Sequence, residues 1–307
     1  MPFWITKNAI ADLVVLRLAR RELTSRLMVA AVGIPLAATI ILWGIWPLGI
    51  LMAVTAALGA HEYFRLSPDE NVAFGWLGAM LAGALPLIAA LHPDYQSFAP
   101  WAFTLVLGTA LLVLALSLWF RWPDGRPLDA ASRTIMGALY TGGALSFWVL
   151  LRALPEQVFD GATASHGAAL LIFPIWVTWL GDTFAYGCGS RWGRAKLIEA
   201  VSPNKTVVGA IGGLAGSVLA GGIFARLWLS EVPEFALSWP VGAALSVPIA
   251  VVGQVGDLAE SVIKRDAGVK DSGHLLPGHG GVLDRLDALF FTVPLTYALL
   301  LLIRPWL

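Results

Sequence analysis

The sequence predicts an all-α, polytopic integral membrane protein of about nine transmembrane helices, with its N-terminus in the cytoplasm. Hydrophobic residues make up 58% of the 307 residues and charged residues only 13%, whereas soluble domains carry about 25% charged residues. The mean hydropathy is +0.75. The apolar residues fall into serial stretches of about 20, the length that a helix needs to cross a bilayer. One integrated membrane domain accounts for this composition.

The spans follow from these stretches in chain order. The first two form one apolar run that is interrupted at Trp46-Pro47, where proline lacks the N–H needed inside a helix. A single kinked helix there would give eight spans instead of nine. The expected spans lie at residues 27–43, 47–64, 72–91, 98–120, 134–153, 167–186, 207–229, 239–262 and 287–304.

Basic residues favour the count of nine, because short cytoplasmic loops collect Lys and Arg. With nine spans, the other side of the membrane receives only Arg152, Arg226 and Arg304. The remaining 17 basic residues fall on one side, which is therefore the cytoplasmic side. They are Lys7, Arg17, Arg20, Arg21, Arg26, Arg65, Arg121, Arg126, Arg133, Arg191, Arg194, Lys196, Lys205, Lys264, Arg265, Lys270 and Arg285.

Three parts of the chain can be distinguished within this single domain. Residues 1–26 form a cytoplasmic or interfacial arm, 27–160 hold the N-terminal transmembrane helices, and 161–307 form a C-terminal transmembrane region, to which the polar motifs described next belong. The composition of the arm suits either an interfacial helix on anionic headgroups or a simple positive-inside anchor. No basic face interleaved with aromatic residues points to nucleic acid.

Charged and glycine residues crowd into residues 261–287, SVIKRDAGVKDSGHLLPGHGGVLDRLD. The spacing S-x-x-K-R-x(4)-K-D-x(7)-H-G-G-x-x-D-R-x-D resembles the motif of the phosphatidate cytidylyltransferase family. The resemblance extends upstream to 181–197, 202–206, 209–213 and 253–261. The N-terminal half is similar to the family only in being a string of membrane helices.

The resemblance implies that CTP and phosphatidate react to give CDP-diacylglycerol and diphosphate in phospholipid biosynthesis. It also implies an enzyme of the cell (inner) membrane whose active site faces the cytoplasm. Magnesium (Mg2+) is the expected cofactor, and a second cation stays open. The expected partners are CTP, the lipid phosphate and membrane lipids. The family tends to form dimers, so a homodimer is an expectation that the sequence leaves open.

Carboxylates are the expected metal ligands. In the family, the Asp of the G-D-L segment and the first Asp of D-R-x-D are implicated in holding metal, and these positions fall on Asp257 and Asp284. Asp287 is a third candidate. Magnesium prefers one or two carboxylates completed by phosphate oxygens and water. Acidic residues in a first helical turn are also favoured by the helix dipole, so capping is the alternative for Asp284 or Asp287.

The basic residues of the motif are expected to neutralise phosphate charge. Lys264 and Arg285 are the leading candidates for the lipid phosphate or the departing diphosphate, and an ordinary positive-inside cluster is the alternative. SPNKT precedes a glycine-rich helix whose N-terminus suits phosphate, or needs a cap. The expected substrate-binding residues are Asp182, Ser202, Asn204, Lys205, Thr206, Lys270, Asp271, His279, Gly280 and Gly281.

Two alternatives stay open at this point. Family members commonly carry an acidic residue where this chain has Val208, so the acceptor could be another lipid phosphate, such as an isoprenoid or ether lipid phosphate. A membrane transporter is the alternative from a different class, because buried acids and glycine-rich helices also mark ion pathways. Glu62 is expected to pair with Arg65 or to line a lipid entrance, and a structural role is favoured.

Overall fold

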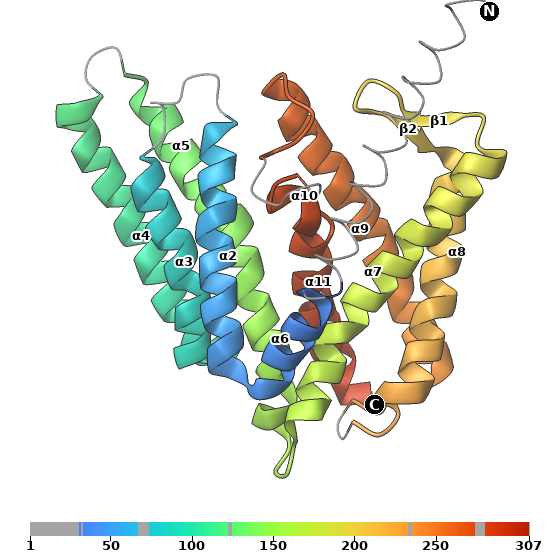
Figure 1. Ribbon diagram of the computed structural model, residues 1–307. Coiled ribbons are helices and arrows are strands. Elements are labelled where there is room, and N and C mark those ends of the chain that lie inside the picture. Colours follow the sequence, from blue (N-terminus) through green and yellow to red (C-terminus); the bar gives the residue numbers. More distant parts are fainter. Residues whose placement is uncertain are drawn as a thin grey trace, which may run out of the picture.

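The computed structural model describes residues 31, 33–66, 74–121, 125–232, 235–273 and 280–306. The chain forms a bundle of helices that run in alternate directions (Figure 1). An apolar helix, Gly33–Trp43, comes first. The elements that follow are α2 (Ile45–Arg65), α3 (Gly75–Leu91), α4 (Tyr95–Phe120), α5 (Pro127–Ala138), α6 (Ala144–Val158), α7 (Ala164–Trp192), β1 (Lys196–Ile198), β2 (Ser202–Thr206), α8 (Val207–Phe224), α9 (Trp239–Asp266), α10 (Leu283–Leu286) and α11 (Leu289–Ile303).

The prediction of an all-α protein with about nine spans is confirmed. Among the described residues, seven helical segments are long and apolar enough to cross a membrane, and Gly33–Trp43 and Gly75–Leu91 are shorter apolar helices. The first two spans are separate helices. The break falls at Gly44, whose φ of +144° lies in the region that favours glycine. Pro47 sits in the first turn of α2, where no N–H donor is needed.

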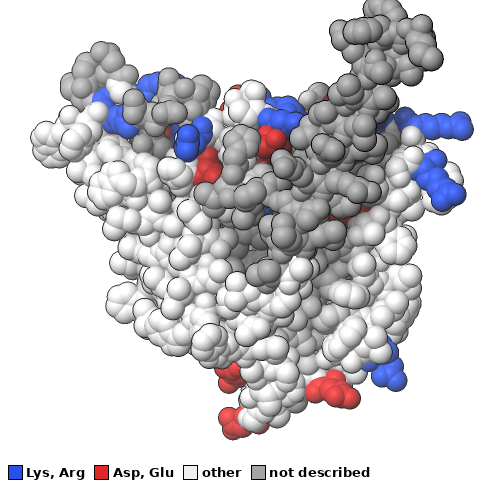
Figure 2. All heavy atoms as spheres, in the orientation of Figure 1, with Lys and Arg blue, Asp and Glu red and all other residues white. Residues whose placement is uncertain are grey.

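Charged side chains gather at the two ends of the bundle (Figure 2). In that view most Lys and Arg side chains lie around the upper end, and a broad uncharged belt separates the two ends. The upper end holds the hairpin β1–β2 and the C-terminal end of α9 (Figure 1). This distribution agrees with the predicted alternation of basic loops. The arm at residues 1–26 lies outside the described residues.

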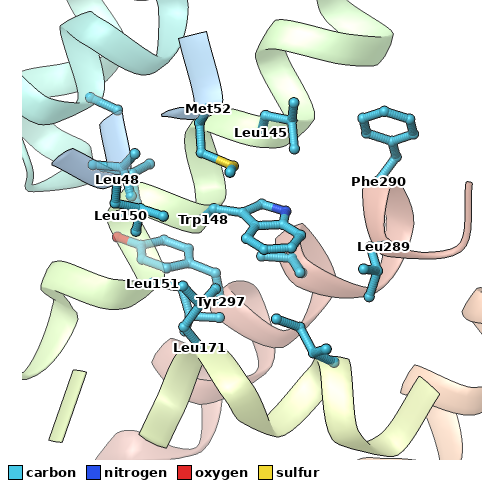
Figure 3. Close-up of a cluster of buried hydrophobic side chains, with 14 of the residues drawn as sticks. Leu48, Met52, Leu145, Trp148, Leu150, Leu151, Leu171, Leu289, Phe290 and Tyr297 are labelled. Carbon is cyan, nitrogen blue, oxygen red and sulfur yellow. The ribbon is translucent and has the colours of Figure 1, made fainter. Parts of the chain in front are cut away.

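The core joins the N-terminal and C-terminal halves. Buried side chains from α2, α6, α7 and α11 point toward one another across the interior (Figure 3). They include Leu48, Met52, Leu145, Trp148, Leu150, Leu151, Leu171, Leu289, Phe290 and Tyr297. The cluster contains residues from both 27–160 and 161–307, so these two regions share one core. The division between them reflects only where the sequence motifs lie.

The helices α7, α8 and α9 form the part of the bundle that carries the hairpin (Figure 1). A Cβ at Gly212 of α8 would lie 2.6 Å from Cys188 of α7. Small residues let membrane helices approach this closely. The hairpin itself was not expected, since SPNKT was interpreted only as the segment before a helix. Its strands pair antiparallel, with Lys196 opposite Thr206 and Ile198 opposite Ser202.

The close approach of α3 to the π-helical segment η1 (Leu139–Gly143) generates a prediction about stability. A Cβ at Gly142 would overlap the backbone of Ala82. We expect Gly142→Ala to destabilise the protein by about 1–3 kcal/mol, because neither backbone can yield easily. The thermal unfolding midpoint of the purified protein in detergent measures this. Gly108→Ala in α4 is the control, since its Cβ would meet no atom within 4 Å; equal losses would contradict the packing argument.

Candidate active site

A cavity of about 530 Å³ opens between α7, α8, α9 and the hairpin. Its volume lies within the range of roughly 300–1,000 Å³ that is typical of small-molecule sites. The hairpin and the first turn of α8 contribute one wall, and α7 and α9 contribute the others. The polar residues of the lining are Asp182, Tyr186, Ser190, Asn204, Lys205, Thr206, Gln254 and Asp257.

Three charged groups from three elements meet in this cavity. The Nζ of Lys205, on β2, lies 2.6 Å from an oxygen of Asp257, on α9. The Asp257 side chain is 36% exposed, so the ion pair opens onto the cavity and is not sealed off. Asp182, on α7, lies close enough to both partners for the charges to interact. The cavity therefore combines two carboxylates with one ammonium group.

The N-terminus of α8 also borders the cavity. The Thr206 hydroxyl caps the helix by accepting a hydrogen bond from the Gly209 N–H at 3.1 Å. On α9, the Gln254 side chain donates to the carbonyl of Ala210 at 3.1 Å. The first turn of a helix presents N–H groups and positive potential, which suit phosphate. Capping and phosphate binding are thus compatible uses of the same segment.

A second and more buried group of charged side chains joins α9 to the motif segment, as we call residues 261–287. The Nζ of Lys264 lies 2.6 Å from Glu260, one turn earlier on α9, and 2.7 Å from Asp284 on α10. All three side chains are well buried: Glu260 is 1% exposed, Asp284 7% and Lys264 12%. One lysine therefore offsets part of the charge of two carboxylates. We call Glu260, Lys264 and Asp284 the buried triad.

Asp284 also connects two parts of the motif segment, residues 272 and 281, which lie on either side of residues 274–279 in the sequence. Its Oδ2 accepts hydrogen bonds from the Ser272 N–H at 2.9 Å, the Ser272 hydroxyl at 3.0 Å and the Gly281 N–H at 2.8 Å. Its Oδ1 accepts from Lys264. Hydrogen bonds to a charged acceptor are stronger than neutral ones. The carboxylate thus fixes residues 272 and 281 against α10.

Known proteins resemble this chain over nearly its whole length. The model of the cytidylyltransferase family matches residues 24–303. The chain belongs to the cytidylyltransferase family.

This cytidylyltransferase is accordingly a nucleotidyltransferase and a multi-pass membrane protein. It is similar to a protein named phosphatidate cytidylyltransferase from Synechocystis sp., with 33% identity over 92% of this chain and 98% of that protein. A protein of the same name from Brucella abortus is 36% identical over 84% of this chain and 87% of its own length. One from Bacillus subtilis is 28% identical over 86% and 92%.

The expected site residues of the cytidylyltransferase fall into distinct groups. Asp182, Asn204, Lys205, Thr206 and Asp257 line the cavity. Lys264 and Asp284 belong to the buried triad, beside Gly280 and Gly281. Ser202 pairs with Ile198 in the hairpin, and Lys270, Asp271 and Arg285 are exposed and lie outside the lining of the cavity. His279 lies outside the described residues. The roles of all these residues stay predictions.

Asp287 lies between the two charged groups. Its backbone carbonyl approaches Gly256 on α9, where an added Cβ would lie 2.9 Å away. Its Oδ1 accepts a hydrogen bond from the Ala288 N–H at 2.7 Å. The charges of Asp257 and Glu260 both act on its carboxylate. Asp287 thus places a third carboxyl group near Asp257 and Glu260.

The family generally depends on a divalent cation. In the described part of the chain, no group of three His, Cys, Asp or Glu residues is arranged to hold a metal ion by itself. Magnesium, however, commonly needs only one or two carboxylates, with phosphate oxygens and water completing its shell. The exposed Asp257 carboxylate beside Asp182 fits this requirement. Asp284 fits it less directly, because four hydrogen-bond donors already occupy its oxygens.

Sequence reasoning did not single out Ser190, Gln254 or Ser272, which contribute to these sites. Gln254 and Ser272 carried no signal beyond lying inside similar segments. Glu62 was expected to pair with Arg65 or to line a lipid entrance, with a structural role favoured; its carboxylate accepts hydrogen bonds from Leu283 and Ser272. No ion pair joins Glu62 to Arg65 among the described residues. A charged residue in a span was the available signal, because such residues are costly unless they have a partner.

Gly280 generates a prediction about the buried triad. Its φ is +78°, and a Cβ there would lie 2.7 Å from Oδ2 of Asp284. We expect Gly280→Ala to lower turnover at least tenfold, because the new methyl group displaces the carboxylate in addition to straining the backbone. Gly268→Ala is the matched control, with a φ of +70° and no atom within 4 Å of the added Cβ.

Strain alone costs about 1–2 kcal/mol in either variant. Initial rates of nucleotide transfer, normalised to folded protein, separate strain from displacement. Equal activity in the two variants would contradict a role for the position of Asp284.

Proposed function

We propose that this protein transfers the cytidylyl group of CTP to phosphatidate, giving CDP-diacylglycerol and diphosphate, at the cytoplasmic face of the cell (inner) membrane. The observation that carries the proposal is the cavity at the basic end of the bundle. There Lys205, Asp257, Asp182 and the N-terminus of α8 converge. The names of the similar proteins support phosphatidate as the acceptor.

The reaction has a simple balance of bonds. An oxygen of the lipid phosphate forms a bond to the α-phosphorus of CTP, and the bond from that phosphorus to the oxygen bridging to the β-phosphate breaks. Diphosphate leaves with the electron pair of the broken bond. Two polyanions have to meet, so neutralisation of charge is the main requirement and the protein needs to supply little covalent chemistry.

Lys205 and the first turn of α8 are suited to the phosphates of CTP. The ammonium group is already in the cavity, and the helix N-terminus adds N–H donors next to it. Lys205 lies against Asp257 in the described structure, so binding of phosphate requires the lysine to exchange or share its partner. Asn204 and Thr206 lie on the same wall and complete this part of the proposed site.

A divalent cation is expected to bind between the cavity carboxylates and the nucleotide, and magnesium is the proposed ion. Asp257 is the leading ligand, with Asp182 and Asp287 beside it. When bound, the ion neutralises the charge that develops on the phosphate oxygens. Ligation by Asp284, or a second cation near it, would require Lys264 to leave that carboxylate.

The remaining motif residues are proposed to act on the lipid phosphate and on diphosphate. Arg285, Lys270 and Asp271 are exposed at the same end of the protein as the cavity. Lys264 pairs with the carboxylates of Glu260 and Asp284, so it contributes to phosphate binding only if one of these ion pairs breaks. A homodimer remains part of the proposal, and cross-linking in membranes addresses it separately.

One experiment tests the activity and the acceptor together. The purified protein is incubated with labelled CTP, magnesium and a panel of phosphatidate, ether lipid phosphate and isoprenoid phosphate. We expect labelled CDP-diacylglycerol from phosphatidate, its loss on chelation of the metal, and no product from an Asp257→Asn preparation. Product from another lipid phosphate alone would assign that acceptor instead. Ion flux in proteoliposomes without nucleotide turnover would favour a transporter.

Lys205 provides a second prediction. We expect Lys205→Ala to raise the KM for CTP by roughly 10- to 100-fold, because a charge-assisted hydrogen bond contributes about 1.5–3 kcal/mol. Lys196→Ala is the matched control: Lys196 belongs to the same hairpin, donates to the carbonyl of Pro203 at 2.5 Å, and does not line the cavity. Rates measured over a range of CTP concentrations give both constants. An unchanged KM in the Lys205 variant would remove this residue from the nucleotide site.

A further inference from the structure

A buried carboxylate in the N-terminal half contacts the motif segment directly. Glu62 lies in the last turn of α2 and is 6% exposed. Its Oε2 accepts hydrogen bonds from the Leu283 N–H at 3.0 Å and from the Ser272 hydroxyl at 3.2 Å. These partners lie more than 200 positions later in the chain. Glu62 therefore links α2 to Ser272 and Leu283, which lie on either side of residues 274–279 in the motif segment.

The link continues to the buried triad. The hydroxyl of Ser272 lies 3.2 Å from Glu62 and 3.0 Å from Asp284. A serine hydroxyl has one hydrogen, so the two carboxylates share a single donor. Leu283, whose N–H binds Glu62, directly precedes Asp284. Glu62 is thus connected to Asp284 in two ways: through the Ser272 hydroxyl and through the backbone of Leu283.

The backbone at Gly273 and Gly281 packs closely against the Glu62 carboxylate. A Cβ at Gly273 would lie 2.7 Å from its Oε1, and a Cβ at Gly281 would lie 2.5 Å from its Oε2. The motif segment is therefore shaped around this side chain. The same contacts point the carboxylate toward α10 and not toward Arg65.

Burial of this carboxylate is costly for stability alone. Its Oε1 has no hydrogen-bond partner within the described residues. A buried carboxylate is unfavourable unless its oxygens are paired or hydrogen-bonded, and an apolar side chain of similar size would avoid the cost. Its placement is better explained by the geometry that it imposes on Ser272 and Leu283.

We propose that Glu62 is a positioning residue for the reaction: through Ser272 and Leu283, it sets the position of Asp284 and Lys264. The inference rests on the proposed function and deepens it, because it makes α2 part of the catalytic machinery. Glu62 does not line the nucleotide cavity. Its effect should therefore fall on turnover and not on the affinity for CTP.

Three variants test this role. We expect Glu62→Leu to lower kcat at least tenfold with the KM for CTP within twofold of the wild type. Glu62→Gln keeps one oxygen that can accept both hydrogen bonds, so we expect it to retain at least a third of the wild-type kcat. Thr55→Val on the same helix removes a hydroxyl that bonds only to Leu51 of α2 at 2.8 Å, and should leave both constants unchanged.

Coupling to Ser272 provides a readout that general destabilisation would not give. If Glu62 acts through Ser272, the Glu62→Leu/Ser272→Ala double variant should be no slower than the slower single variant. Multiplied losses would overturn the proposal, as would a Gln variant as slow as the Leu variant. Wild-type turnover in the Leu variant would also overturn it. If Glu62→Leu does not fold, the comparison of Gln with Ser272→Ala decides: both should fold, and the serine variant should lose kcat alone.

The assay uses whichever lipid phosphate the wild type accepts. A wild type that makes no CDP-diacylglycerol but converts another lipid phosphate contradicts the proposed acceptor, and the comparison of Glu62 variants is made with that lipid. A Leu variant as fast as the wild type contradicts only the positioning role.

Discussion

The pairing of lysines with carboxylates at one end of an apolar bundle is the interaction on which the rest of the site depends. Acidic residues inside or beside a membrane span are costly unless a partner offsets their charge. Lys205 fulfils this need for Asp257, and Lys264 fulfils it for Glu260 and Asp284. Without these two cations, the packing of α7, α8, α9 and α10 would bring several carboxylates together with little to compensate them.

The two lysines serve different environments. The pair Lys205–Asp257 faces an open cavity, whereas the buried triad is closed and supported by backbone donors. Both groups share α9, since Asp257, Glu260 and Lys264 lie within eight consecutive positions of the chain. Helix α9 therefore connects the ion pair Lys205–Asp257, which opens onto the cavity, with the buried triad.

Hydropathy was sufficient to predict an all-α bundle of about nine apolar helices, because hydropathy acts locally along the chain. Glu260 and Lys264 lie at i and i+4 on α9, so their contact follows from the helix itself. The pairs Lys205–Asp257 and Lys264–Asp284 join different elements, so periodicity could not reveal them. Glu62 was harder still, since its partners come from the opposite half of the sequence. The hairpin was missed because its short, polar strands lack an apolar alternation.

The lengths of α7 and α9 have a consequence for how the substrates meet. Asp182 follows Ala164, the first residue of α7, by 18 positions, and Asp257 follows Trp239, the first residue of α9, by 18 positions. At a rise of 1.5 Å per residue, each carboxylate lies roughly 27 Å along its helix, close to the ~30 Å thickness of a hydrocarbon core. A helix that begins at one boundary of such a core therefore carries its carboxylate to the level of the opposite headgroups. In the proposed reaction, this depth lets a lipid phosphate reach both carboxylates without leaving its leaflet, while the water-soluble nucleotide comes from the aqueous side.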